Sequence, residues 1–480
     1  MGRGEARIYD FAVVGSGTSG GVLAYYLQKA GAQTLLIEAG KRYSAGTFPR
    51  NEADYSAQLF WGGGIEFDSR CMMGFLRGKC VGGGSVVNQA LLDRFDDLAW
   101  DDWRAASGID FLTADAMAPH YETIESELSL QSIPEDRRNR NAHLFTQGLD
   151  RLGIAWAPLR RGQSHCATEQ GNDCMACLGG CHRDSKQSTL ATFIPRAEAL
   201  GLEVLSEFHV GRIEPDRNGV TIHGTGRDGK ESLRAGACVL AAGSFGTTHL
   251  LLASGFGKRL PALGKGFSMH PQYMTFAEFD DPVDAHKGAF QSVKSADLGL
   301  RKKGYKLENV FAPPVSVAML FAGAGAPLQA FMMKYRHLAC VEVAVRDEAT
   351  GELSLDRRGR LRVRKVLTDN DEARRDDGLS LVRNLFESLG AKSIFQSPLY
   401  FGLHLMGGCA IGADPRSSVV DETFQIHGVP NLYCADTSVY PLAPGINPAL
   451  TCMALSHKLA GNLSKGKRER RGADAGEVWV

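Results

Sequence analysis

The sequence predicts an α/β protein in which a dinucleotide-binding domain is interleaved with a second domain built on an antiparallel sheet. A glycine-rich strand-to-helix turn lies at residues 9–21, and a strand, a hairpin and a further strand follow at 220–243. Alternating apolar residues at 276–346 and 353–367 predict the antiparallel strands of the second domain. The 480 residues suffice for two domains with large cores.

The composition is that of an ordinary globular protein and excludes several kinds of partner. Hydrophobic residues make up 44% of the chain and charged residues 22%, with a formal net charge of zero. A neutral chain gives no reason to expect binding to nucleic acid. The first strand begins by Ile8, so we expect no signal peptide and a cytoplasmic location.

The longest uncharged segment, residues 309–333, has the length of a membrane span. It is interrupted by Pro313, Pro314, Gly323 and Pro327, which are poorly suited to a continuous helix in lipid. We therefore expect no transmembrane segment, and we interpret this stretch as buried structure that lines a substrate cavity. Docking to a membrane surface is the alternative.

The N-terminal turn has the features of a dinucleotide-binding site. Residues 8–14 form a short apolar run, and Gly15, Gly17 and Gly20 follow as G-x-G-x-x-G at the start of a predicted helix over 19–30. The first glycine allows a tight turn, the second lets the backbone approach a pyrophosphate, and the third permits close packing of helix on strand. The alternative is a glycine-rich turn that binds nothing.

An acidic residue stands at the expected place after this turn. Residues 33–37 form a second predicted strand that ends at Glu38, where a carboxylate can accept hydrogen bonds from ribose hydroxyls. The N-terminus of the intervening helix faces the phosphate charge. We accordingly place Thr18 and Ser19 in the predicted cofactor site.

Two later segments favour FAD over a nicotinamide cofactor. RGKCVGGGS at 77–85 is a second glycine-rich loop, and we assign Gly83, Ser85 and Asn88 from this region to the cofactor site. A polar hairpin turn at 224–230 precedes a buried strand that ends at Ala242, also assigned to the site. This order of strand, hairpin, strand and glycine is typical of glutathione-reductase-like flavoproteins.

The C-terminal part carries a third set of polar residues. His404 precedes a Gly-Gly turn, Asp436 ends a predicted strand, and Asn447-Pro448 opens an apolar helix after a Pro/Gly loop. Read alone, His404 could be a hydrogen-bonded core histidine, Asp436 the mere end of a strand, and Asn447 a helix cap.

With these segments placed, the chain resembles the glucose–methanol–choline (GMC) oxidoreductase family. The resemblance rests on GSGTSGG, RGKCVGGGSVVN, VLAAGSFGTTHLLLASG, GKGFSMHP, the H-x-x-G-G-C of residues 404–409, and NLYCADTSVYP with NPALT. It implies FAD-dependent oxidation of a small-molecule alcohol, with a flavin domain interleaved with a substrate domain. Val87 stands where some members carry a histidine that bonds covalently to FAD, so we expect non-covalent FAD.

The resemblance also implies roles for individual residues. His404 matches the active-site base that accepts the hydroxyl proton while hydride leaves to flavin N5. Asn447 matches the residue that orients the hydroxyl, and Asn88 the loop residue beside the flavin ring. Asp436 matches the acid near the ribityl chain, and the helix beginning at Pro448 points its N-terminus at the flavin.

A cysteine-rich segment at 166–181 departs from this pattern. Its spacing is C-x7-C-x2-C-x3-C, which suits thiolate binding but matches neither a ferredoxin nor a zinc pair of pairs. The candidates are an iron–sulfur cluster, zinc, or structural thiols and disulfides. The candidate metal ligands are Cys166, Cys174, Cys177 and Cys181.

These alternatives lead to different functions. An iron–sulfur cluster would favour a dehydrogenase that passes electrons to an acceptor protein or a quinone, and this is the leading expectation. An alcohol oxidase using dioxygen is the close variant, and a flavin-containing lyase, resembling hydroxynitrile lyases or a photodecarboxylase, is the alternative of another class. A group of apolar residues hints at the substrate pocket, namely Met72, Met73, Phe75, Phe331, Met332 and Met333.

The expected domains are discontinuous in sequence. Residues 1–90, 190–265 and 400–465 are assigned to the FAD-binding domain. Residues 91–189 and 266–399 are assigned to the substrate domain, and residues 466–480 to a tail.

Overall fold

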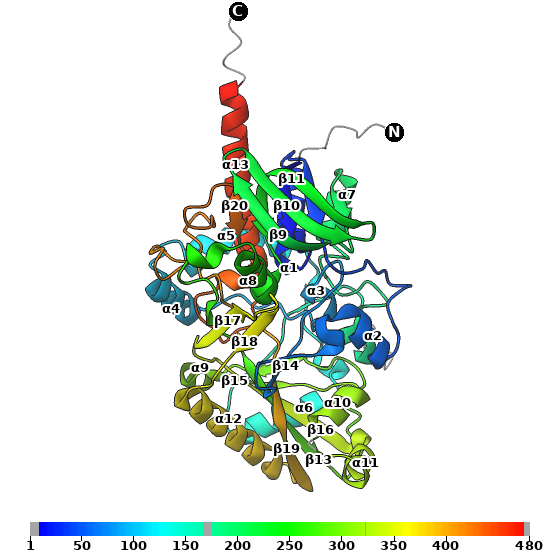
Figure 1. Cartoon of the computed structure of the whole chain (residues 1–480). Helices are drawn as coiled ribbons and strands as arrows, with labels where there is room; N and C mark the ends of the chain where they lie inside the picture. Colours follow the sequence, from blue (N-terminus) through cyan, green and yellow to red (C-terminus); the bar gives the residue numbers. More distant parts are fainter. Residues whose placement is uncertain (1–8, 167–173, 322, 475–480) are drawn as a thin grey trace, which may run out of the picture.

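The computed structural model describes residues 9–166, 174–321 and 323–474. Two large β-sheets lie at opposite ends of the molecule, and a small sheet lies between them (Figure 1). The first sheet lies at the end where both termini emerge, and the second lies at the far end. This arrangement confirms the predicted mixed α/β fold with an antiparallel sheet in the second part.

The first sheet has seven strands. Its centre is parallel, because β1 pairs in parallel with β2 and with β11, and β11 pairs in parallel with β20. The predicted hairpin is present as the antiparallel pair of β10 and β11. The strands are β1 (Tyr9–Val14), β2 (Thr34–Ile37), β8 (Glu203–Leu205), β9 (His209–Asp216), β10 (Gly219–Gly226), β11 (Gly229–Leu240) and β20 (Leu432–Cys434).

Helices from both ends of the chain pack together on this sheet. The first helix, α1 (Thr18–Lys29), contacts α13 (Ala449–Asp474), the last helix of the described chain. Gly20 allows α1 to lie close to the sheet, since a Cβ atom there would stand 1.8 Å from the carbonyl oxygen of Gly15. The other helices of this part are α5 (Ala114–Ser126), α7 (Phe193–Ala199) and α8 (Gly243–Ala253).

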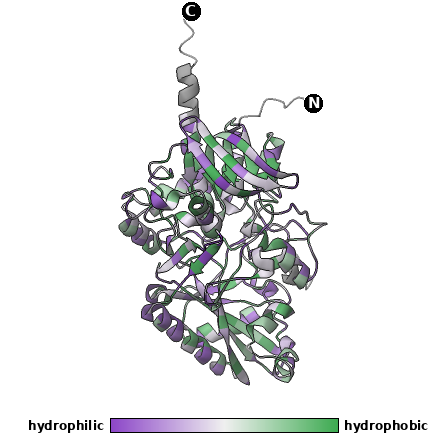
Figure 2. Ribbon diagram, viewed as in Figure 1, coloured by the Kyte–Doolittle hydropathy of each residue, from purple (hydrophilic) through white to green (hydrophobic). Residues whose placement is uncertain are grey.

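The second sheet has eight strands and is mostly antiparallel. Helix α12 (Asp369–Ser388) begins with a capping box between Thr368 and Asp371 and packs on β13 and β16. Its outward residues are mostly hydrophilic (Figure 2). The strands are β3 (Glu66–Phe67), β4 (Met73–Phe75), β6 (Trp156–Pro158), β13 (Pro271–Glu278), β14 (Val293–Ser295), β15 (Tyr305–Asn309), β16 (Leu338–Val345) and β19 (Ser393–Gly402).

Shorter elements connect the two sheets. The small sheet comprises β12 (Lys265–Phe267), β17 (Gly351–Leu355) and β18 (Leu361–Arg364), and β5 (Leu130–Gln131) pairs with β7 (Arg161–Gly162). The remaining α-helices are α2 (Glu52–Leu59), α3 (Gly84–Val87), α4 (Asp97–Ser107), α6 (Arg140–Arg151), α9 (Leu298–Lys303), α10 (Pro314–Leu320) and α11 (Ala326–Met332).

The segment 276–346 agrees with the sequence expectation in part. It contains the antiparallel strands that were expected, from the end of β13 through β14 and β15 to β16, but α9, α10 and α11 interrupt them. The uncharged run forms two of these helices, and its Val315 and Met319 are exposed by 50% and 45%, so it is not fully buried. Within the described ranges, no helix combines the length and apolar character needed to cross a membrane.

The contact at Gly20 gives a first testable prediction. In the variant Gly20→Ala, the added methyl group must push α1 away from the Gly15 carbonyl, which should lower the free energy of unfolding by about 3 kcal/mol. Denaturant unfolding measures the change. Gly46→Ala is the matched control, because a Cβ atom at Gly46 meets no atom within 4 Å. Equal stability of the two variants would contradict the close packing of α1.

Candidate active site

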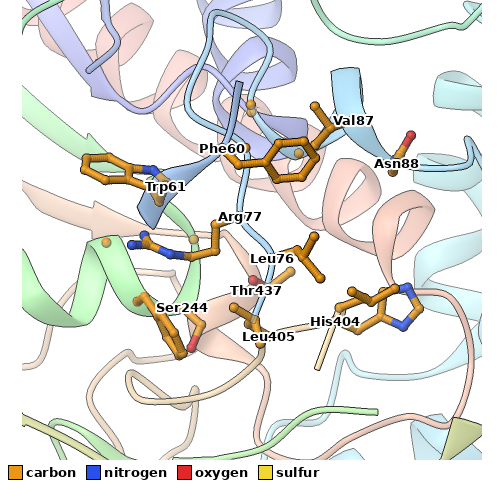
Figure 3. A pocket seen from close by; sticks show the side chains of 18 of the residues that line it. Phe60, Trp61, Leu76, Arg77, Val87, Asn88, Ser244, His404, Leu405 and Thr437 are labelled. Carbon is orange, nitrogen blue, oxygen red and sulfur yellow. The ribbon is translucent and has the colours of Figure 1, made fainter. Parts of the chain in front are cut away.

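A cavity of about 760 Å³ lies between the two large sheets. It is lined by the turn between β1 and α1, the loop before α3, the start of α8, and strands β13, β15 and β16. The C-terminal segments around His404, Thr437 and Asn447 complete it. Figure 3 shows Asn88, His404 and Thr437, from separate segments, around this cavity.

At one end, the chain presents bare backbone to the cavity. Gly15 has φ of +100°, and a Cβ atom there would stand 2.4 Å from the carbonyl oxygen of Ala241. A Cβ atom at Gly17 would meet nothing closer than the Cα atom of Gly83, at 3.9 Å. Helix α1 has no side-chain cap, so backbone N–H groups at its N-terminus are left for an anionic ligand.

Glu38 lies at the end of β2 and lines the cavity. Its carboxyl group accepts hydrogen bonds from the Ser16 amide (3.1 Å), the Ser16 hydroxyl (2.7 Å) and the Gly40 amide (2.8 Å). Burial raises the pKa of Glu38, and these hydrogen bonds oppose that rise. The side chain is therefore held in a fixed orientation beside the cavity, where it can accept from hydroxyl groups.

The loop that carries Asn88 is fixed by a buried lysine. Lys186 Nζ donates to the carbonyl oxygens of Val86 (2.8 Å), Asn88 (2.6 Å) and Cys177 (2.6 Å). Asn88 and Val87 line the cavity, as do Gly83, Thr18, Ser19 and Ala242. Lys186 thus ties this loop to the cysteine-rich segment.

Two residues assigned to the cofactor site from sequence do not line the cavity. Gly20 packs beneath the turn against Gly15, and the Ser85 hydroxyl donates to the Gly82 carbonyl at 2.6 Å. Both residues support the glycine-rich loops through contacts on the side away from the cavity.

Asp436 and Pro448 both line the cavity. The Asp436 carboxylate accepts from the Gly243 amide (2.8 Å), the Thr247 hydroxyl (2.6 Å) and the Ser438 amide (2.8 Å). It therefore holds the end of β20 against the start of α8.

His404 lines the cavity and is paired with a second histidine. The Nδ1 atoms of His404 and His270 lie 3.0 Å apart, and His270 Nε2 accepts a hydrogen bond from the Gly445 amide at 2.9 Å. Because His270 Nε2 is an acceptor here, the proton of a neutral His270 lies on Nδ1 and is donated to His404 Nδ1. Nε2 is then the ring nitrogen of His404 that faces a substrate, and in this tautomer it carries the proton of the ring. Burial, and then the nearby charge of Lys306, lowers the pKa of His404 from 6.5 to about 3, so the imidazole is neutral at ordinary pH.

Asn447 is buried, with 2% of its surface exposed, and lines the same cavity. Its amide oxygen accepts a hydrogen bond from Lys306 Nζ at 3.0 Å. Its amide nitrogen has no hydrogen-bond partner among the residues that the structure describes. The amide is thus oriented by Lys306 and keeps a donor for a ligand, which a helix-capping role alone does not require.

These features fit FAD. The bare glycine turn and the uncapped helix suit a pyrophosphate, and Glu38 suits a ribose. The cavity continues from there past Asn88 to His404 and Asn447, so one long ligand can reach from the first helix to the polar pair. Among the residues of this chain, Gly17, Glu38, Asn88 and Pro448 would contact the cofactor.

Several cavity residues were missed from sequence. The eight-stranded sheet contributes Gln272, Glu308 and Glu342, each less than 4% exposed, and Gln291 lies beside them. Glu342 alone had a clear signal, as a single charged residue within the otherwise apolar strand β16. His270 lies in the GKGFSMHP motif, but no role was predicted for it, and none was predicted for Lys306.

The apolar residues proposed for the substrate pocket lie elsewhere. Met72 and Met333 are exposed by 58% and 78%, and Phe75 and Phe331 pack within hydrophobic clusters. None of the six lines the cavity. The apolar wall is formed instead by Met274, Val310, Phe311, Leu320 and Leu403.

The cysteine-rich segment shows no metal site in the described part of the chain. No group of three His, Cys, Asp or Glu side chains within the described ranges can hold a metal ion. Cys177 is buried, and Cys166 and Cys181 are half-buried. Cys174 lies in the 3₁₀ turn Cys174–Gly179, and its side chain lies outside the described residues. The expected iron–sulfur cluster is therefore not supported.

Known proteins that resemble this chain include GMC-type oxidoreductases and alcohol oxidases. An uncharacterized GMC-type oxidoreductase of Mycobacterium tuberculosis is 28% identical over 94% of this chain and 75% of the relative. A long-chain-alcohol oxidase of Arabidopsis thaliana is 25% identical over 95% of this chain and 67% of the relative. Pyridoxine 4-oxidase from Mesorbium loti has a similar fold, with a TM-score of 0.74, 17% identity, and coverage of 94% of this chain and 98% of that chain.

Family models cover both halves of the site. The N-terminal model of GMC oxidoreductases matches residues 9–272, and the C-terminal model matches residues 347–456. The first match includes the glycine turn and Asn88, and the second includes His404, Asp436 and Asn447. On these matches, the chain belongs to the GMC oxidoreductase family.

Proposed function

We propose that this protein oxidises an alcohol to a carbonyl compound with FAD. The observation that carries the proposal is the meeting of His404 and Asn447 in one cavity with the glycine turn of β1 and α1. When bound, the FAD supplies the acceptor for the hydride that leaves the alcohol carbon. Membership of an oxidoreductase family favours net oxidation over the lyase alternative.

Residues of the chain orient the hydroxyl group of the alcohol and accept its proton. The amide nitrogen of Asn447 donates to the alcohol oxygen and thereby fixes its position. His404 Nε2 accepts the hydroxyl proton in the tautomer whose own proton lies on Nδ1 and is donated to His270 Nδ1; His270 then carries its proton on Nε2 and gives up the hydrogen bond from the Gly445 amide. The C–H electron pair leaves with the hydrogen as hydride, so the C–O bond becomes a double bond. His270 positions the His404 ring, and Lys306 positions the Asn447 amide.

We further propose dioxygen as the electron acceptor. A metal cluster at the four cysteines would have favoured the expected dehydrogenase over an oxidase, and the described residues give that cluster no support. Two relatives are named as oxidases, the long-chain-alcohol oxidase and pyridoxine 4-oxidase. These two names favour direct reaction with oxygen.

Removal of the imidazole tests the base. In His404→Asn, the rate of anaerobic flavin reduction by an alcohol should fall by about a hundred-fold to ten-thousand-fold. The flavin content, measured from the visible absorbance, should stay unchanged. His223→Asn, in the exposed hairpin of β10, is the control and should reduce at the normal rate. Normal reduction in His404→Asn would refute the assignment.

The low pKa of His404 predicts an unusual pH profile. A base with a pKa of about 3 is already deprotonated at neutral pH, so its protonation cannot limit the rate there. The rate of flavin reduction should be flat from about pH 5 to about pH 8 and fall only as the pH drops toward 3. Stopped-flow reduction across this range measures it. A loss of rate centred near the ordinary histidine pKa of 6.5 would contradict the lowered pKa of His404.

The electron acceptor is tested by product analysis. With an alcohol that reduces the flavin, turnover in air should consume one dioxygen and release one hydrogen peroxide for each carbonyl formed. An oxygen electrode and a peroxide assay on the same sample give this ratio. Turnover that needs an added quinone or redox dye, with no oxygen consumed, would instead identify a dehydrogenase.

A further inference from the structure

The wall of the cavity formed by the eight-stranded sheet is unusually polar. Strands β13, β16 and β15 are neighbours, and their register places Glu342 directly opposite Met274 on one side and Glu308 on the other. Gln272 and Lys306 both lie opposite Ala344, two residues further along β16, so they belong to the same face of the sheet. Buried carboxyl and amide groups therefore face the candidate reaction site.

Most of the charge in this wall is already paired. Lys306 Nζ lies 2.5 Å from Glu308 Oε1 and 3.0 Å from the amide oxygen of Asn447. Gln291 Nε2 donates to Glu308 at 3.0 Å and to Glu342 at 3.3 Å. A continuous polar chain thus leads from Asn447 across β15 to β16.

Among the described residues, Glu342 is the carboxyl group of this wall that forms no ion pair, whereas Glu308 is paired with Lys306. It is 1% exposed, and its neighbour across the strands is the carboxylate of Glu308. Burial, and then the Glu308 charge, raise the pKa of Glu342 well above its ordinary value, which favours the neutral carboxylic acid over a second buried carboxylate. With Lys306 balancing Glu308, the wall is close to neutral overall. A neutral wall suits a hydroxyl group better than an ammonium group.

Gln272 supplies an acceptor that the protein does not use. Its side chain is 3% exposed and lines the cavity, and its amide oxygen has no hydrogen-bond partner among the described residues. A buried acceptor without a partner is costly, so a bound group that donates to it would be favoured.

From these observations we propose that Gln272 and Glu342 bind a second hydroxyl group of the substrate, which makes diols and larger polyols its substrate class. This inference rests on the proposed oxidation of an alcohol in the same cavity. One hydroxyl meets His404 and Asn447, and the other donates to the Gln272 amide oxygen beside Glu342. The apolar side chains of Met274, Phe311 and Leu320 accommodate the carbon chain.

The test compares alcohols that share a carbon skeleton. The holoenzyme is reduced anaerobically with hexan-1-ol, with the hexanediols from 1,2 to 1,6, and with 6-aminohexan-1-ol. At least one diol should have a kcat/KM about ten-fold above that of hexan-1-ol, because a site with buried polar groups discriminates against an analogue that leaves them unpaired. The amino alcohol should show no such advantage. A preference for the amino alcohol or for hexan-1-ol would overturn the proposal.

Variants distinguish binding of the second hydroxyl group by Gln272 and Glu342 from a purely structural role of these residues in the sheet. Gln272→Leu and Glu342→Leu should lower the diol-to-hexanol ratio toward one, whereas Glu342→Gln, which is neutral like the protonated acid, should keep most of it. Thr275→Val is the matched control, since the Thr275 hydroxyl is buried and unpartnered within the described residues but does not line the cavity. An unchanged ratio in Gln272→Leu would show that the polar wall serves the fold alone.

A binding measurement separates failure of this proposal from failure of the proposed function. Calorimetric titration of the holoenzyme with the same alcohols requires no turnover. Tighter binding of a diol by the wild type than by Gln272→Leu supports the hydroxyl site, whether or not any alcohol reduces the flavin. If no alcohol reduces the flavin, only the proposed oxidation is refuted. Equal binding by both proteins would refute the hydroxyl site.

Discussion

The approach of α1 to the turn after β1 is the constraint on which the site depends. Gly20 lets the helix lie directly against the Gly15 carbonyl, and this contact directs the uncapped N-terminus of α1 toward the cavity. Helix α13 packs on α1, and Asn447 lies just before α13 begins. A displacement of α1 would therefore move both the phosphate end and the polar end of the site. The contact between Gly15 and Gly20 thus helps to position Asn447, which lies more than 400 residues away in the sequence.

The reacting groups are held by contacts between the two halves of the molecule. His404 and Asn447 come from C-terminal segments, whereas His270 and Lys306 lie at or on strands of the eight-stranded sheet. Gly445 adds a third connection, through the hydrogen bond that its backbone N–H donates to His270 Nε2. Each of these polar groups is buried at a cost and is oriented by another, which suits a site that must hold a hydroxyl group in one geometry.

The features that the sequence predicted are those set by local backbone conformation. The glycine turn, the hairpin of β10 and β11, and the helix after Asn447-Pro448 each carry their own signal in a few adjacent residues. The polar wall could not be found in this way, because Glu308 and Glu342 become neighbours only through the register of β15 and β16. The helices at 298–332 were missed for a related reason, since apolar residues in short segments fit a strand as readily as a short buried helix. The link between Lys306 and Asn447 spans 141 positions and has no local signature at all.

This division also explains how one family can use different alcohols. The cofactor end is built from backbone groups and glycines, which leave little room for variation. The facing wall is built from single side chains on β13, β15 and β16, and these can change without disturbing the strands that carry them. In this chain they are Gln272, Glu308 and Glu342, and a purely alkyl substrate would leave the Gln272 oxygen buried and unpaired. The similarity to a long-chain-alcohol oxidase covers 95% of this chain at 25% identity, so it does not fix the side chains of this wall, and under the proposed hydroxyl site the wall would select against a simple alkyl chain.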